Sequence, residues 1–284
     1  MGTLVQIRKP DSAEVDAARR EEVLFKRLAE IPSLLIAVSG GADSAYLAWA
    51  AHQVLDVNAL SITAISPSYS AHDRVELEKL VAHTGVRHEF VETHEMDNPA
   101  YRANAGDRCY YCKDELFSVL DKLAKARGFA AVAYGVNADD ISDFRPGHRA
   151  AAEHQILAPL LEAKMSKADI RILSQRAGLP TWDRPASACL SSRLPYGTEV
   201  TPERLQLVEN GESILRDLGF RQFRVRLHDK LARIEIAPEE LPQAMTAEMG
   251  AMIAERFKSA GFLYVALDLE GYRQGSLNAA LKAR

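Results

Sequence analysis

Residues 34–50 read LLIAVSGGADSAYLAWA, and this stretch decides the fold of the first part of the chain. An apolar run typical of a buried strand ends at residues 39–41 in Ser-Gly-Gly, and a helical pattern begins at once. Further apolar runs alternate with helical patterns through roughly the first 180 residues, which is the pattern of βαβ units. We therefore predict an α/β domain with a doubly wound parallel sheet.

The expected elements follow from the spacing of the apolar residues. Strands are predicted at residues 34–38, 60–65, 87–92, 130–135 and 155–160. Helices are predicted at 72–85, at 114–128, and at 166–180, where Ser166 would cap the start. Right-handed crossovers place every strand-to-helix turn at one edge of the sheet, which is where ligands of such folds bind.

A second, smaller domain is expected after an irregular, proline-punctuated segment at residues 181–202. The predicted domains are 1–185 and 186–284. The second contains a helix at 203–217, strands at FRVRL and ARIEIA, a helix at 239–260, a strand at LYVALDL and a short helical tail. This order predicts an α+β domain with an antiparallel sheet.

Composition limits the classes of function. The chain has 284 residues and a net charge of -4, which provides no overall field that would gather nucleic acid. No apolar run approaches the roughly 18 residues of a membrane span, so we expect a cytoplasmic enzyme without membrane contact. Three cysteines are too few, and an odd number, for the disulfide framework of a secreted protein.

The turn SGGADS at residues 39–44 has the chemistry of an anion site. Backbone N–H groups and a helix N-terminus converge there, and a phosphate is the expected occupant. The Walker A pattern, which ends in Gly-Lys-Ser/Thr, is absent. Two adjacent glycines with flanking hydroxyls suit a whole pyrophosphate, and Asp43 is a candidate Mg²⁺ ligand. The alternative is a tight strand–helix turn in which Asp43 or Ser44 caps the helix.

The hexapeptide resembles the PP-loop of the ATP pyrophosphatase superfamily in all its fixed positions. The resemblance implies a Rossmann-like fold that cleaves ATP between its α- and β-phosphates and adenylates a substrate oxygen. The expected ATP-binding residues are Ser39, Gly40, Gly41, Asp43, Ser44, Ser66, Gly135 and Asn137, with Asp43 and Asp140 as magnesium ligands. The alternatives are an Asx turn around Asn137 and Asp139, and a Ser-Pro turn at Ser66 that needs no ligand.

The three cysteines require an explanation of their own. Cys109 and Cys112 form a CxxC pair just ahead of a predicted helix, and Cys189 follows in PASACLSSR. A CxxC pair is half of a zinc site, a redox pair, or two ligands of an iron–sulfur cluster. Zinc would need a fourth ligand, and a redox pair would not require ATP. Three thiolates on a [4Fe–4S] cluster leave one iron able to carry sulfide, while three unrelated buried cysteines are the structural alternative.

Longer stretches carry a more specific resemblance. CYYCK (109–113), YGVNADDISDFRPG (134–147) and LPTWDRPASACLSSRLPYG (179–197) resemble the LarE-type sulfur transferases of nickel-pincer nucleotide biosynthesis. The resemblance implies ATP-dependent adenylation of a pyridinium dicarboxylate mononucleotide, followed by conversion of its carboxylates to thiocarboxylates for the cofactor of lactate racemase. It also implies a sulfide source as a partner, and a homo-oligomer.

The resemblance gives Cys189 two possible roles. In sacrificial members, the matching cysteine forms a thioester and gives up its sulfur, which leaves dehydroalanine after one turnover. Other members also carry the CxxC pair, and there Cys109, Cys112 and Cys189 would be the catalytic ligands of a [4Fe–4S] cluster. Because this sequence has all three cysteines, the cluster version is favoured.

Three arginines are the expected substrate-binding residues: Arg193, Arg224 and Arg226. Arg224 and Arg226 lie two apart on a predicted strand and share a face, which suits the phosphate of a mononucleotide. Arg193 and Arg145 match phosphate oxygens in the same bidentate way. The alternative for the strand arginines is an ion pair with Glu235 on the neighbouring strand.

Other classes of function remain open. PP-loop enzymes with a CxxC pair and a distant third cysteine also thiolate tRNA, but no basic, aromatic RNA-binding surface is visible at a net charge of -4. An ammonia-using ligase of the superfamily would not require three cysteines, and a non-catalytic nucleotide-binding module is compatible with the fold. The leading prediction is therefore a sulfur transferase that uses ATP, Mg²⁺ and a [4Fe–4S] cluster.

Overall fold

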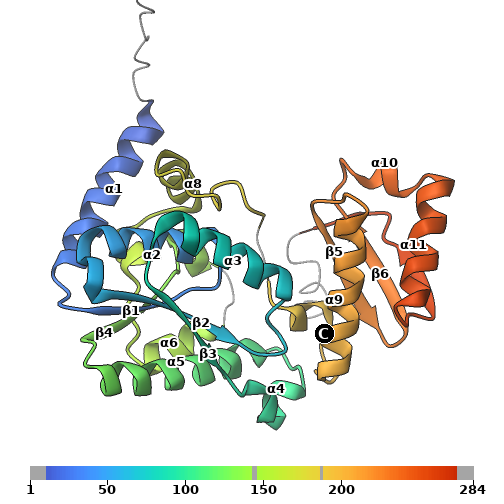
Figure 1. Cartoon of the computed structure of the whole chain (residues 1–284), viewed down its shortest axis with the longest axis horizontal. Helices are drawn as coiled ribbons and strands as arrows, with labels where there is room; N and C mark the ends of the chain where they lie inside the picture. Colours follow the sequence, from blue (N-terminus) through green and yellow to red (C-terminus); the bar gives the residue numbers. More distant parts are fainter. Residues whose placement is uncertain (1–10, 143–145, 186–187, 274–284) are drawn as a thin grey trace, which may run out of the picture.

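The computed structural model describes residues 11–142, 146–185 and 188–273, which form two lobes with a sheet in each (Figure 1). In the N-terminal lobe four parallel strands lie in the order β3-β2-β1-β4. They are β1 (Leu34–Ala37), β2 (Ala59–Ile65), β3 (His88–Glu92) and β4 (Ala131–Tyr134). This arrangement confirms the predicted parallel sheet, with every strand ending at the same edge.

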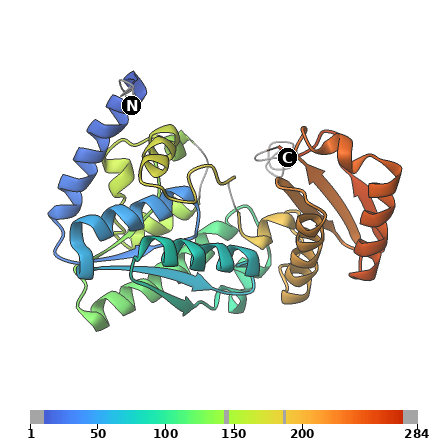
Figure 2. The ribbon, with the colours of Figure 1, turned by 45° about the horizontal axis from the view of Figure 1, so that its top comes forward.

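Helices cover both faces of this sheet, as Figure 2 also shows. Leu34 and Ile36 of β1 pack into one hydrophobic cluster, and Leu35 and Ala37 pack into another, because successive strand residues point to opposite faces. The first cluster includes residues of α1 (Ser12–Ala29), α2 (Ala42–Leu55), α3 (Ala71–Thr84) and α8 (Lys167–Arg176). The second includes residues of α5 (Arg108–Arg127) and α6 (Gly147–Glu153). The doubly wound prediction is therefore confirmed.

One predicted strand is wrong, and several helices were not predicted, of which α1 is the longest. Residues 155–160 form only a single bridge, between Leu157 and Ala133, because Pro159 has no N–H and begins the short helix α7 (Pro159–Glu162). Helix α1 has a capping box between Asp11 and Glu14, a signal present in the sequence. Shorter turns complete the lobe: η1 (Asp56–Asn58), η2 (Glu95–Asp97), α4 (Pro99–Arg102) and η3 (Ala138–Ser142).

The start of α5 also differs from the prediction. The helix begins at Arg108, so the CxxC pair lies inside its first turn instead of ahead of it. The boundary was hard to predict because Asp107 makes no side-chain capping hydrogen bond. At the other end, Gly128 closes the helix in a left-handed conformation, as expected. Cys109 and Cys112 are therefore one helical turn apart.

The C-terminal lobe has a three-stranded sheet in the order β5-β6-β7. Its elements are α9 (Pro202–Asp217), β5 (Phe223–His228), β6 (Leu231–Ile236), α10 (Leu241–Ala244), α11 (Ala247–Ser259) and β7 (Tyr264–Leu267). Strands β5 and β6 are antiparallel, but β7 is parallel to β6 because α10 and α11 return the chain to the other end of the sheet. The sheet is therefore mixed, and the antiparallel prediction was wrong for β7.

The predicted helix at 239–260 is divided into α10 and α11, because Thr246 is extended and caps α11. Most of the expected helical tail lies outside the described residues. The C-terminal lobe has its own hydrophobic cluster, although Tyr101 from α4 packs within it. The two lobes thus meet around α4, and the exact domain boundary stays a prediction. None of the helices in the described part of the chain is long and apolar enough to span a membrane.

Candidate active site

The glycine turn at residues 39–44 connects β1 to α2. Gly40 has a φ of +80°, a conformation that glycine adopts without strain, and Gly41 is the N-cap of α2. The backbone N–H of Ser39 donates to Ser44 Oγ (3.1 Å), and Ser44 Oγ donates to the carbonyl of Gly41 (3.1 Å). The hydroxyl group of Ser44 therefore fixes the shape of the turn. The N-terminus of α2 behind the turn favours an anion.

Gly135, at the end of β4, touches the back of the glycine turn. A Cβ at this position would lie 2.6 Å from the backbone nitrogen of Ser44 and 2.7 Å from its Cα. No side chain fits at these distances, so the close approach of the two backbones requires glycine. The structure thus brings the predicted residues Gly135 and Ser44 together and gives Gly135 a packing role.

Lys167 places a cation beside the glycine turn, although no lysine directly follows the two glycines in the sequence. Its Nζ lies 2.7 Å from both carboxylate oxygens of Asp43, although the two residues are 124 positions apart. The backbone N–H of Lys167 donates to Asp139 (2.8 Å) at the start of α8. Sequence reasoning missed Lys167, because its only signal was its position beside the capping residue Ser166.

Asn137 and its neighbours form the next part of the same sheet edge. Asp139 N–H donates to Asn137 Oδ1 (2.9 Å), and Asn137 N–H donates to Asp140 Oδ2 (3.2 Å). The Asx turn named as an alternative is therefore present, and Asp140 is nearly buried at 9% exposure. Roles in binding ATP or Mg²⁺ stay predictions for Asn137 and Asp140. Arg145 lies outside the described residues.

The buried carboxylate of Glu95, in η2, lies beside the residues that follow β2. Glu95 is 3% exposed and accepts hydrogen bonds from Ser66 Oγ (2.5 Å) and Ser68 Oγ (3.1 Å). Ser66 is therefore held by protein contacts, and its expected role in binding ATP stays a prediction. The carbonyl of Ser68 accepts from the N–H of Leu190, which ties the residue after Cys189 to this sheet edge. Glu95 had no signal in the sequence beyond its type.

The three cysteines lie on two separate segments of the chain. Cys109 and Cys112 lie in the first turn of α5, and Cys189 is the N-cap of η4 (Leu190–Arg193). Burial raises the pKa of the Cys112 thiol, and the charges of Glu95 and Cys189 raise it further. Cys112 and Cys189 are therefore electrostatic neighbours, and the gathering of all three thiols on one cluster stays a prediction.

Solvent reaches Cys109 and Cys189, but the protein surrounding Cys109 still affects its chemistry. Desolvation by this surrounding protein raises the pKa of the Cys109 thiol, and Cys189 adds to the rise, while the Arg108 guanidinium opposes it. Arg108 is 4% exposed and donates to the carbonyl of Ser191 (2.8 Å). A buried cation therefore lies beside Cys109, but burial outweighs it and the net pKa of the thiol is raised.

Arg193 is oriented toward the protein. Its guanidinium forms a buried bidentate pair with Glu212 (2.8 and 3.0 Å) and donates to the carbonyl of Cys189 (3.0 Å). Burial lowers the pKa of Arg193, but the charge and hydrogen bonds of Glu212 outweigh burial, so the net shift is upward. These contacts favour a role in holding the Cys189 turn over the expected contact with substrate.

Arg224 and Arg226 lie on β5, near Arg193 of η4. Arg226 donates to Glu235 (2.8 Å) and to the carbonyl of Ser192 (2.9 Å), so the ion pair named as the alternative is present. Burial lowers the pKa of Arg224, and the positive charges of Arg193 and Arg226 contribute, so the three guanidinium groups are electrostatic neighbours. This cluster of cations from the C-terminal lobe approaches the residues that follow Cys189.

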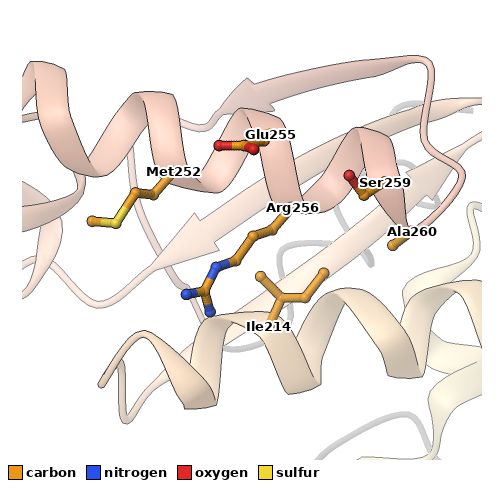
Figure 3. A pocket seen from close by; sticks show the side chains of 6 residues that line it. All are labelled: Ile214, Met252, Glu255, Arg256, Ser259 and Ala260. Carbon is orange, nitrogen blue, oxygen red and sulfur yellow. The ribbon is translucent and has the colours of Figure 1, made fainter.

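A surface depression on the C-terminal lobe is separate from these groups. It lies between α9 and α11 (Figure 3) and is lined by Ile214, Met252, Glu255, Arg256, Ser259 and Ala260. None of the glycine-turn residues, cysteines or clustered arginines lines it. The candidate active site is instead the sheet edge where the glycine turn, the thiols and Glu95 lie.

Comparison with known proteins identifies the family. No family model matches the chain. A pyridinium-3,5-bisthiocarboxylic acid mononucleotide synthase of Lactiplantibacillus plantarum is 33% identical over 268 residues, which cover 93% of this chain and 95% of the relative. The chain belongs to the LarE family. The LarE resemblance found in the sequence is thus confirmed at the level of the family.

Two uncharacterized proteins are also similar to this LarE family member. One, from Synechocystis sp., is 47% identical over 260 residues, covering 92% of this chain and 97% of the relative. The other, from Methanocaldococcus jannaschii, is 33% identical over 170 residues, covering 60% of this chain and 66% of the relative. The similarities to the proteins of Lactiplantibacillus plantarum and Synechocystis sp. extend over both lobes. The family relationship therefore includes the C-terminal sheet as well as the glycine turn.

Proposed function

We propose that this LarE family member is an ATP-dependent sulfur transferase that converts the carboxylates of a pyridinium dicarboxylate mononucleotide to thiocarboxylates. The observation that supports the proposal is that the glycine turn follows β1, while the N–H of Leu190, next to Cys189, donates to the carbonyl of Ser68 after β2 of the same sheet. The relative from Lactiplantibacillus plantarum, named as a pyridinium-3,5-bisthiocarboxylic acid mononucleotide synthase, supports the substrate class. The thiocarboxylates would serve the nickel-pincer cofactor.

Activation of the carboxylate is the first step of the proposed reaction. A carboxylate oxygen attacks the α-phosphorus of ATP, pyrophosphate leaves, and an acyl adenylate forms. The N–H groups of the glycine turn and the ammonium group of Lys167 would stabilise charge on the departing pyrophosphate. Asp43 would bind Mg²⁺ only after releasing Lys167, because Lys167 now contacts both of its carboxylate oxygens.

Sulfur transfer from Cys189 is the simplest second step. The Cys189 sulfur attacks the acyl carbon, AMP leaves, and a thioester forms. Cleavage of the Cβ–S bond, with transfer of the Cα proton to solvent, then releases the thiocarboxylate and leaves dehydroalanine. Arg193 would keep the Cys189 turn in place through its bond to the Cys189 carbonyl. In this version each chain reacts once.

A [4Fe–4S] cluster is the version that uses all three cysteines. No three cysteine, histidine or carboxylate side chains within the described ranges converge closely enough to bind one metal ion. In a cluster each cysteine binds a different iron, so the three thiols would not need to converge on one point. Cys109, Cys112 and Cys189 would hold it, and the remaining iron would supply bound sulfide for repeated turnover.

The cationic cluster of the C-terminal lobe would receive the phosphate of the mononucleotide. Arg224 is half-buried, and its guanidinium lies 5.2 Å from the centre of the Tyr272 ring. Burial and neighbouring cations lower its pKa, which is the condition in which an added phosphate would be stabilised most strongly. Arg226 and Arg193 would contribute mainly through their charge, because their guanidinium groups donate to Glu235, Ser192 and Glu212 of the protein.

The test uses anaerobically purified chain with ATP, Mg²⁺ and pyridinium-3,5-dicarboxylate mononucleotide. We expect pyrophosphate, AMP and thiocarboxylate products by mass spectrometry. In the cluster version we expect a brown protein with about four irons per chain. Iron-free protein that loses the Cys189 sulfur would instead establish the sacrificial version.

Cys189→Ala separates the two half-reactions. We expect ATP cleavage to continue in this variant while thiocarboxylate formation falls at least about a thousandfold, since a covalent nucleophile or a cluster ligand is lost. Sulfur transfer that survives in Cys189→Ala would contradict both versions. Strong, salt-sensitive binding of tRNA, without reaction of the mononucleotide, would favour the tRNA thiolation enzyme instead.

A further inference from the structure

Three buried polar side chains hold the segment that follows Cys189. They are Tyr101, Asn104 and Arg108, with exposed fractions of 1%, 0% and 4%. All three come from the stretch between α4 and the first turn of α5, and all contact residues 191–198. We call them the polar clamp. Neither the sequence motifs nor the proposed chemistry assigns them a role.

Asn104 makes the largest number of these contacts. Its Nδ2 donates to the carbonyls of Pro195 (2.8 Å) and Thr198 (3.0 Å), with a longer bond to Leu194 (3.4 Å). The main-chain carbonyl of Asn104 accepts from the N–H of Gly197 (3.0 Å). The turn after η4 is thus organised around one fully buried amide, and burial without solvent makes each of these bonds costly to remove.

Arg108 and Tyr101 extend the clamp toward Cys189. Arg108 Nη1 donates to Asn104 Oδ1 and also to the carbonyl of Ser191 (2.8 Å). Tyr101 Oη and Ser191 Oγ share a hydrogen bond of 2.7 Å. Ser191 is two residues after Cys189, and Arg108 is the residue before Cys109. The clamp therefore connects the two parts of the chain that carry the thiols.

The backbone of Asn104 supports a specific need for its side chain. Its φ is +52°, a left-handed conformation that glycine adopts most easily and that asparagine tolerates better than most residues. Glycine would satisfy the backbone, but only asparagine also supplies the amide that reaches the carbonyls of Pro195 and Thr198.

We propose that Asn104 and Arg108 are positioning residues that set the distance between the Cys189 thiol and the CxxC thiols. This role rests on the sulfur-transfer function proposed above, since that reaction needs the thiols close together. A purely structural clamp would stabilise the fold without affecting how fast the thiols meet. The two roles therefore differ in a measurable rate.

The first test measures the bridging of two thiols in the full chain. In a Cys112→Ser background, Cys109 and Cys189 remain, and dibromobimane becomes fluorescent only after it links both. We expect Asn104→Gly to lower the bridging rate at least about tenfold, because the amide is lost while the left-handed backbone is still allowed. Asn98→Ala is the matched control, because Asn98 only caps α4 (2.9 Å to Ala100 N–H).

The second test measures the two half-reactions of the same variants, with all three cysteines present. For Asn104→Gly we expect pyrophosphate release to stay within about twofold of the original chain and thiocarboxylate formation to fall at least about tenfold. Arg108→Lys keeps the charge but not the two directed bonds, and we expect an intermediate loss. Loss of both half-reactions in proportion would indicate a structural role.

The outcomes separate this inference from the proposed function. Unchanged bridging in folded Asn104→Gly overturns the positioning role, whatever the chain catalyses. Unfolding of Asn104→Gly, seen as loss of the cooperative thermal transition while Asn98→Ala keeps it, also overturns it in favour of a structural clamp. If the original chain forms no thiocarboxylate, the proposed function fails, while the bridging rates still decide whether the clamp sets the thiol distance.

Discussion

The glycine turn and the thiol site lie at the same sheet edge but are built in different ways. The glycine turn consists of six consecutive residues, and its main side-chain bond joins Ser39 to Ser44, five positions apart. The thiol site joins α5 to η4, and its hydrogen bonds span 83 positions from Arg108 to Ser191 and 90 from Tyr101 to Ser191. One site is a local motif, and the other depends on tertiary contacts.

This difference predicts which changes will affect which half of the reaction. Substitutions behind the glycine turn should alter ATP binding and leave the thiols in place, because the hydroxyl hydrogen bonds that shape the turn stay within residues 39–44. Changes in the packing of α5 should do the reverse. Three substitutions test this separation.

Gly135→Ala should have the largest effect, on the ATP half alone. The new Cβ would lie 2.6 Å from the backbone nitrogen of Ser44, so the turn must move. A displacement of this size costs about a hundredfold in a positioned reaction, and we expect a loss of that order in ATP cleavage, measured by pyrophosphate release. Bridging of Cys109 to Cys189 by dibromobimane should stay within about twofold.

Gly250→Ala is the matched control. Gly250 lies within α11, and a Cβ there would meet open space. The change should stabilise the chain by about 0.5–1 kcal/mol, because alanine favours helices over glycine. Equal loss of ATP cleavage in both variants, or slower thiol bridging in Gly135→Ala, would show that the two sites are not separable.

The same contrast explains what the sequence could predict. The parallel sheet and the glycine turn were predictable because apolar periodicity and SGGADS are local signals, and the cysteines could be grouped because a family pattern includes them. Lys167, Glu95 and Asn104 were not, because each acts through a partner at least 27 positions away: Asp43, Ser68 and Pro195. The crossover to β7 also depended on packing that the sequence does not state, whereas Pro159 was a visible signal against the predicted strand at 155–160.

Lys167→Gln should have the second largest effect. The substitution removes the ammonium group that lies 2.7 Å from Asp43 beside the glycine turn. A hydrogen bond to a charged group contributes about 1.5–3 kcal/mol, so ATP cleavage should fall about tenfold or more. Pyrophosphate release at saturating ATP, with thiol bridging as the second readout, checks this prediction.

The control for Lys167 is Lys79→Gln, which removes a surface ion pair with Glu76 (2.7 Å) on α3. Exposed pairs contribute little, so this variant should keep its activity. If Lys167→Gln were as active as the control, the ion pair with Asp43 would be structural only. Loss of thiol bridging in Lys167→Gln would mean that the glycine turn and the thiol site are coupled.

The substitution His154→Gln should have the smallest effect. It tests the packing of α5, the helix that carries the CxxC pair. The ring follows α6, and its nitrogens lie 2.7 Å from Asp121 and 3.0 Å from Asp114, both on α5. Burial lowers the pKa of His154, but the hydrogen bonds and charges of the two carboxylates outweigh it, so the net pKa is raised above 6.5. When protonated, the ring ties α6 to α5 through both carboxylates.

The sign of the pH effect follows from this raised pKa. The stabilisation is fully present below about pH 6.5, the unfolded value, and is lost as the pH rises through the higher folded value. Thermal midpoints of the original chain should therefore fall, relative to His154→Gln, as the pH rises through that window. Asp114→Asn with Asp121→Asn should remove the same dependence, because the carboxylates cause the shift. ATP cleavage measured across this window should not follow the midpoints, since His154 contacts Asp114 and Asp121 on α5 and the glycine turn is held by its own local bonds. If it does follow them, α5 packing supports both sites, and the local turn depends on tertiary structure after all.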